Sequence, residues 1–140
     1  MHDIEETAKE IVDAALLIHR TVGPGMFESA YETMLAYELE DRGHHVERQK
    51  YISLKYRTLN IERAYCVDLF VNECVPVEVK AVTALAPAHV TQVVTYLKMM
   101  DLQVGLLINF GQPTLKAGLR RVMNDYPDPR GTQPVCRRPG

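Results

Sequence analysis

The segment 65–82 constrains the fold of this chain more than any other. Its β-branched and apolar residues, divided by a short polar turn, predict two neighbouring strands. Three ionisable residues, Asp68, Glu78 and Lys80, interrupt these strands. Charged groups inside a buried strand cost desolvation free energy unless they pair with one another or hold a cation. We therefore predict that these three residues form a functional site that binds a metal ion.

The turn between the two strands decides whether the three charges meet. Side chains two positions apart on a strand share a face, so Glu78 and Lys80 point the same way. In an antiparallel hairpin, a loop with an odd number of residues centred on Glu73 places Asp68 opposite Glu78, whereas a two-residue loop does not. We predict the odd loop. Two carboxylates that meet repel each other, and a divalent cation with oxygen ligands relieves the repulsion. Lys80 beside them is then placed to hold a water or a developing negative charge.

Size and composition indicate one ordinary globular domain. The chain has 140 residues, of which 46% are hydrophobic and 24% charged. No apolar run approaches the ~20 residues of a membrane span, and the N-terminus lacks the pattern of a secretory signal, so we expect a cytoplasmic protein without membrane contact. The three cysteines lack a CxxC spacing, which predicts reduced thiols. The net charge of −2 means that nucleic-acid binding would need a local basic patch.

Apolar periodicity predicts an α/β fold. Helices are expected over about 3–20, from 27 or 28 to 43, and from Pro87 to about 100; strands over 46–56, 59–71, 75–82 and 104–110; and a last helix capped by Thr114. This order predicts a mixed central sheet of about four strands flanked by helices in the arrangement α-α-β-β-β-α-β-α. The domain would span 1–126, followed by a flexible, Pro/Gly-rich tail over 127–140.

Several further residues have both a structural and a functional interpretation. Glu28 lies in the first turn of a predicted helix, where the helix dipole alone favours an acid; alternatively, Gly25 lets the backbone bend toward the site and Glu28 adds a carboxylate. Gln92 and Tyr96 are four residues apart on a helix and point together, although a half-buried hydrogen bond also accounts for them. The last helix would present three basic residues outward, a face that is usually solvated but is the best candidate for phosphate contacts in the C-terminal half: Lys116, Arg120 and Arg121.

These motifs, in this order, resemble the PD-(D/E)XK nuclease superfamily, with Asp68 and Glu78-Val79-Lys80 as its signature. Gly25-x-x-Glu28 and Gln92-x-x-x-Tyr96 look like the GxxE and QxxxY motifs of the RecB-type branch. Gly25-x-x-Glu28-x-x-Tyr31, together with the segments 78–82 and 105–110, resembles the small bacterial GxxExxY proteins grouped with that superfamily. The resemblance spans roughly 11–124. One departure is that no proline precedes Asp68.

The resemblance implies a restriction-endonuclease-like core and a role for each matched residue. Asp68 and Glu78 would be ligands of Mg²⁺ (or Mn²⁺), with the Val79 carbonyl in the same shell. Glu28 would bind the metal or its water, and Lys80 would orient and activate the attacking water. The supporting residues, which would steady the site or the nucleic-acid backbone, are Gly25, Tyr31, Gln92 and Tyr96. The cluster-binding cysteines of some RecB-type relatives are absent, so no iron–sulfur cluster is expected, and without a glycine-rich loop no nucleotide cofactor is expected either.

The residues and this resemblance together predict a metal-dependent nuclease that hydrolyses phosphodiester bonds in DNA, with DNA favoured over RNA as the partner and the choice between them left open. Small size and modest charge suggest weak intrinsic affinity, which a homo-oligomer or a partner protein would strengthen. The alternative is a catalytically silent module that keeps the fold and binds nucleic acid or a partner. The burial cost of Asp68, Glu78 and Lys80 argues against this alternative. A purely structural ion-pair network ranks last, because buried ion pairs stabilise poorly.

Overall fold

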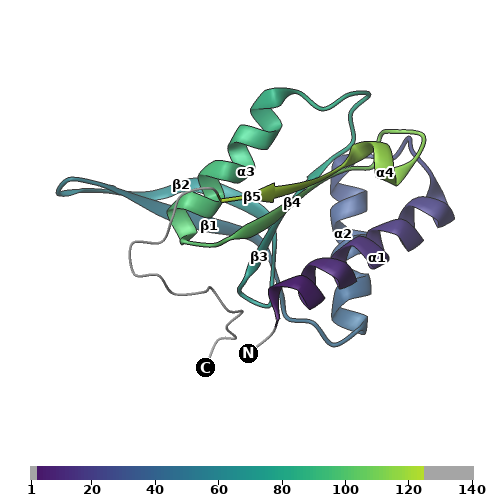
Figure 1. Cartoon of the computed structure of the whole chain (residues 1–140), viewed down its shortest axis with the longest axis horizontal. Coiled ribbons are helices and arrows are strands. Elements are labelled where there is room, and N and C mark those ends of the chain that lie inside the picture. The colour runs from purple at the N-terminus through teal and green to yellow at the C-terminus, as the bar shows by residue number, and fades with distance from the viewer. Residues whose placement is uncertain (1–2, 125–140) are drawn as a thin grey trace.

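A five-stranded mixed sheet forms the centre of the protein in the computed structural model, which describes residues 3–124 (Figure 1). In chain order the elements are α1 (Ile4–Val22), α2 (Glu28–Asp41), β1 (Val46–Tyr56), β2 (Leu59–Val71), β3 (Val75–Lys80), α3 (Pro87–Met100), β4 (Val104–Asn109), α4 (Leu115–Gly118) and β5 (Leu119–Met123). The strands lie in the order in which they occur in the chain. Only β3 and β4 pair in parallel, while the other neighbours are antiparallel. The predicted α/β class with a mixed sheet flanked by helices is confirmed.

Helices cover the two faces of this sheet with separate apolar cores. α1 and α2 pack through Ile11 and Leu35 onto Val77 of β3, within the larger core cluster. α3 packs through Leu97 onto Leu107 of β4, within a smaller cluster. Because neighbouring residues of a strand face opposite ways, the nearly continuous apolar run of β4 serves both cores. Figure 1 shows α3 lying apart from α1 and α2 accordingly.

The turn between β2 and β3 has the register that places the charged residues together. The paired residues are Leu69 with Val77, Phe70 with Pro76 and Val71 with Val75. These pairs are centred on Glu73, so the predicted odd loop is confirmed. Asn72 and Glu73 both have a φ of 53°, a left-handed conformation that asparagine adopts more easily than most residues. The buried Asn72 side chain accepts a hydrogen bond from the His45 amide at 2.9 Å, which ties the turn to the start of β1.

The predicted last helix is wrong over most of its length. α4 covers only Leu115–Gly118, and the chain then forms β5, antiparallel to β4, so the sheet has five strands rather than four. Gly118 gives the physical reason, since a Cβ atom there would lie 2.2 Å from the backbone oxygen of Asn109. The chain therefore passes close to the end of β4 at this glycine, and the residues that follow it pair with β4 as a strand. β3 also ends at Lys80, two residues earlier than expected.

Three further expectations concern features outside the sheet. Cys66 is a free thiol, but Cys74 is disulfide-bonded, so the prediction of reduced cysteines is wrong for Cys74. The tail predicted over 127–140 lies outside the described residues, as does the end of the predicted domain at 126. Between residues 3 and 124, none of the helices has the length and apolar character needed to cross a membrane.

Candidate active site

Asp68 and Glu78 meet where β2 separates from β3. The backbone pairing of these strands ends at Leu69 and Val77, immediately before the two acids. Beyond that point the Asp68 side chain takes over the role of a strand partner, because its Oδ2 accepts a hydrogen bond from the Val79 amide at 2.9 Å. The Asp68 and Glu78 carboxyls are themselves joined by a side-chain hydrogen bond. The two acids therefore form one pair, which is called the carboxyl pair below.

Glu78 is the buried member of the carboxyl pair, with an exposed fraction of 3%. Burial raises the pKa of Glu78 to about 8, and the hydrogen bond and negative charge of Asp68 act in the same direction. A hydrogen bond from Tyr96 and the charge of Lys80 oppose this shift. At neutral pH without a cation, Glu78 therefore keeps its proton and donates it to Asp68.

Tyr96 connects α3 to the carboxyl pair. Its hydroxyl lies 2.8 Å from Oε2 of Glu78 and 3.0 Å from the backbone oxygen of Cys66. Gln92, one turn earlier on α3, hydrogen-bonds the same hydroxyl, as the spacing of four residues predicts. Tyr96 is 1% exposed, and burial raises the pKa of its phenol, so it acts as a neutral hydrogen-bond donor.

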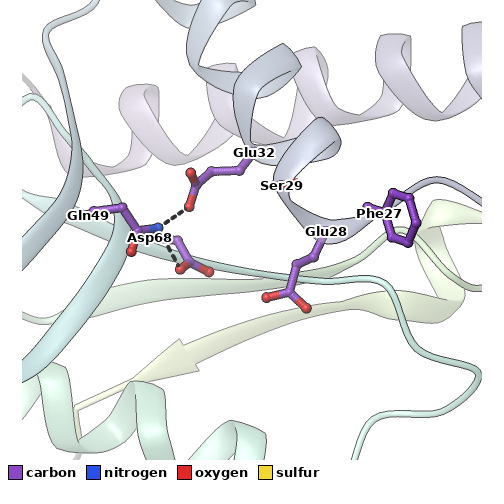
Figure 2. A pocket seen from close by; sticks show the side chains of 6 residues that line it. All are labelled: Phe27, Glu28, Ser29, Glu32, Gln49 and Asp68. Atoms are coloured by element: carbon purple, nitrogen blue, oxygen red, sulfur yellow. Dashed lines mark hydrogen bonds between the residues drawn. The ribbon is translucent and has the colours of Figure 1, made fainter.

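An open cleft of about 500 Å³ lies beside the carboxyl pair, between the start of α2 and the strands β1 and β2. Its lining residues are Phe27, Glu28, Ser29, Glu32, Gln49 and Asp68. Figure 2 shows the carboxylates of Glu28 and Asp68 directed into the same space, with the Gln49 amide between Glu32 and Asp68. Acidic side chains from two different elements thus converge on one cleft.

Lys80 and Glu28 complete this charged group. Burial raises the pKa of Glu28, the positive charge of Lys80 lowers it, and the carboxylates of Asp68 and Glu32 raise it again. The positive charge of Lys80 also lowers the pKa of Glu78, so Lys80 lies within electrostatic range of both Glu28 and Glu78. It is half-buried at the end of β3 and forms no ion pair within residues 3–124. Lys80 and Glu28 therefore lie beside the carboxyl pair, close to the start of α2, and a joint role of Asp68, Glu78 and Lys80 at a metal site stays a prediction.

Glu32 and Gln49 belong to the site but were missed by sequence reasoning. Glu32 is 7% exposed and accepts hydrogen bonds from Arg48, at 2.9 Å, and from the Gln49 amide. The same Gln49 amide donates to Asp68 Oδ1 at 3.2 Å. A signal for Glu32 was available, since it lies one helical turn after Glu28 and next to the core residue Tyr31. Gln49 carries no such signal, because its placement depends on a left-handed backbone with a φ of 49°.

Tyr31 and Gly25 shape the loop that leads into α2. Tyr31 is fully buried and stacks on Phe110 with ring centroids 4.5 Å apart. Its hydroxyl donates to the Gly23 carbonyl at 2.5 Å and accepts from the Met26 amide at 3.1 Å. Gly25 has a φ of 114°, which disfavours any residue with a Cβ atom. Tyr31 therefore supports the loop before Glu28 and does not line the cleft.

The predicted basic helical face does not form. Arg120 and Arg121 are neighbours on β5 and so face opposite sides of the sheet. Arg121 forms an ion pair with Glu5 of α1, whereas the Arg120 guanidinium donates to the carbonyls of Ala117 and Leu119. Lys116 remains exposed on α4. The prediction failed because it assumed helical periodicity where the chain is a strand.

The fold and this site together define an α/β protein with a restriction-endonuclease-like core. The sequence model of the PD-(D/E)XK nuclease superfamily matches residues 5–122, and the chain belongs to that superfamily. No curated protein and no solved structure matches the chain. The match covers the carboxyl pair, Lys80 and both cleft-lining acids of α2.

The oxygen donors at this site fit a hard divalent cation. Among residues 3–124, no group of three or more His, Cys, Asp or Glu residues is arranged to hold a metal ion. Mg²⁺ does not require such a cage, because it commonly binds one or two protein carboxylates and keeps several waters. The carboxyl pair shares a hydrogen bond, so a cation could replace the shared proton. Zinc would be a poorer fit, because its sites use several His or Cys ligands.

Proposed function

We propose that this protein is a metal-dependent nuclease that hydrolyses phosphodiester bonds in DNA. Membership of the PD-(D/E)XK nuclease superfamily supports a nuclease-type function. The observation that carries the proposal is the carboxyl pair itself: two acids in hydrogen-bond contact, one of them buried, beside an open cleft. Such a pair is costly to ionise, because burial desolvates the Glu78 carboxylate and the negative charge of Asp68 repels it.

Asp68, Glu78 and the Val79 carbonyl would hold Mg²⁺ or Mn²⁺, and Glu28 would hold the cation or one of its waters. When bound, the cation lowers the pKa of a water molecule and polarises a phosphoryl oxygen. The residues of the chain keep these ligands in place. Gln49 and the Val79 amide hold the two oxygens of Asp68, while Tyr96 holds Glu78. Hydrogen bonds of this kind orient ligands and tune their basicity.

Lys80 and Glu28 are the groups of this chain that would act on the reacting atoms. Lys80 is half-buried and has no ion pair within the described range, so its ammonium can hold the attacking water and stabilise the developing negative charge. Burial raises the pKa of Glu28, which makes it a better proton acceptor than an ordinary surface glutamate. Glu28 lines the cleft and its carboxylate is directed into it, which supports this role (Figure 2).

A second candidate is a catalytically silent module that binds nucleic acid or a partner protein. One observation favours it, namely that no third His, Cys, Asp or Glu within residues 3–124 completes a metal-binding group with the carboxyl pair. We rank it second because Lys80 and Glu28 both remain beside that pair.

The proposed location of the nuclease is the cytoplasm, where it would meet its DNA substrate. A second copy or a partner protein would raise its affinity.

Cleavage of end-labelled and circular DNA by the purified protein tests the proposal. The wild type should cut in Mg²⁺ or Mn²⁺ and not in EDTA. Asp68→Asn and Glu78→Gln should each lose activity by at least about a hundredfold, because each removes one negative ligand. Glu40→Gln, which neutralises an exposed acid of α2, is the matched control and should keep full activity. Specific metal-independent binding without any cleavage would instead identify the silent module.

A further inference from the structure

The β1–β2 hairpin extends beyond the rest of the sheet as a two-stranded arm. β2 pairs with β3 only over Leu69–Val71, whereas its pairing with β1 continues to the turn at Leu59. Figure 1 shows the hairpin projecting away from α1 and α2. The arm is defined here as residues 51–66. Most of its side chains are exposed, so its length is not explained by core packing.

One face of the arm is continuous with the cleft. Tyr51 lies opposite Cys66, and the Cys66 thiol donates to Oε1 of the cleft residue Gln49 at 3.2 Å. The Arg63 guanidinium lies over the Tyr51 ring, 4.7 Å from its centroid, and therefore shares this face. Lys55 and Arg57 lie farther out on the arm, beyond the register shift between Ile52 and Leu54. The other face begins under α3, where Ile52 and Tyr65 contact Tyr96.

The arm carries unpaired positive charge beside an acidic cleft. Lys55, Arg57 and Arg63 are all exposed, and none of them forms an ion pair within residues 3–124. Glu62 is the single acid of the arm. The whole chain, by contrast, has a net charge of −2. This is the local basic patch that a nucleic-acid binder of acidic composition needs.

We propose that the cleft-side face of the arm binds the phosphate backbone of double-stranded DNA and guides the duplex to the cleft. This inference rests on the proposed function, since it assigns a substrate-binding surface to the same site. At about 3.3 Å per residue, the strand between Leu59 and Cys66 spans about 23 Å. With about 3.4 Å between successive phosphates along the axis, that length matches six or seven base pairs.

The shape of the arm favours a DNA duplex over other nucleic acids. The major groove of B-form DNA admits a two-stranded β-ribbon, whereas the major groove of duplex RNA is too narrow for side chains to read. Tyr51 and Arg63 form a stacked pair at the base of the arm, close to the cleft, and would contact the sugar–phosphate chain there. Lys55 and Arg57 would contact phosphates farther from the reacting bond.

Binding of a labelled duplex in EDTA, followed by fluorescence anisotropy over a range of salt concentrations, tests this inference without cleavage. The arm variant is Lys55→Ala/Arg57→Ala, and the matched control is Lys9→Ala/Arg20→Ala, which removes the same charge from exposed positions of α1. The arm variant should bind roughly tenfold more weakly at 0.15 M salt. Its slope of log K against log salt should be less steep by about 2, because two phosphate contacts are lost. The control should match the wild type, and circular dichroism should show that both variants fold.

The outcomes separate this inference from the proposed function. If the wild type cuts DNA and the arm variant binds DNA as well as the control does, the inference about the arm is wrong and the nuclease proposal stands. If the wild type binds DNA through the arm but never cuts it, the inference about the arm is supported and the nuclease proposal is wrong. The inference is also wrong if the arm binds single strands more strongly than the duplex. It is equally wrong if the arm variant changes a dimer into a monomer without affecting DNA affinity. Wild type that neither binds nor cuts overturns both.

Discussion

Replacing Glu78 by glutamine should make the metal-free protein more stable at neutral pH. The pKa of Glu78 is raised from 4.5 to about 8 in the folded state, chiefly by burial. The stability that this carboxyl contributes is therefore fully present below pH 4.5 and is lost as the pH rises through 8. One pKa unit corresponds to about 1.4 kcal/mol, so between pH 4.5 and pH 7 the wild type loses about 3 kcal/mol through this residue.

Glutamine keeps the contacts of Glu78 without this loss. Its amide oxygen can accept from Tyr96, and its NH₂ group can donate to Asp68, at every pH. In EDTA at pH 7, the free energy of unfolding of Glu78→Gln should exceed that of the wild type by about 2–3 kcal/mol, which for a domain of this size corresponds to a Tm higher by roughly 8 °C. The difference should shrink toward zero near pH 4.5.

Urea denaturation at several pH values measures the effect, with Glu40→Gln as the control that should behave like the wild type. Excess Mg²⁺ should reverse the ranking. A ligand at a thousand times its Kd stabilises the folded state by about 4.1 kcal/mol, which exceeds the advantage of Glu78→Gln, and only the wild type keeps both carboxylates of the proposed metal site. Equal or lower stability of Glu78→Gln at pH 7 in EDTA would refute the claim that this carboxyl is held at a cost for function.

Three further substitutions separate the roles around the carboxyl pair. Lys80→Ala should keep metal binding, measured by calorimetry, while cleavage falls by a factor of about 10² to 10⁴; unchanged cleavage would remove Lys80 from the mechanism. Gln49→Ala frees one oxygen of Asp68 and should weaken Mg²⁺ affinity about tenfold, and unaltered affinity would show that Gln49 does not position the aspartate. Tyr96→Phe deletes the donor to Glu78 and should cost about 1–2 kcal/mol in urea denaturation, whereas a neutral effect would mean that water replaces the phenol.

The sequence was sufficient where local pattern and local geometry agree. The bounds of β1 and β2 follow from alternation on both sides of the polar turn at Arg57. Counting residues around Glu73 predicts the register of β2 with β3, which brings Asp68 next to Glu78 where the pairing ends.

The failures come from contacts between distant parts of the chain. Leu115, Leu119 and Val122 have helical spacing, yet the close approach of Gly118 to the backbone of Asn109 turns this segment into a strand. Gln49 reaches Asp68 only because its backbone is left-handed within a strand, which no periodicity reveals. Sequence reasoning therefore found the carboxyl pair but not the residue that holds one of its oxygens.

Diffraction from crystals soaked in Mn²⁺ shows whether Asp68 and Glu78 hold a cation, because the anomalous signal of manganese locates the ion without reference to activity. We expect a peak within bonding distance of one oxygen of Asp68 and one of Glu78, and no peak there in crystals of Glu78→Gln. If saturating Mn²⁺ leaves this position empty in the wild type, or binds only elsewhere, the carboxyl pair is not a metal site.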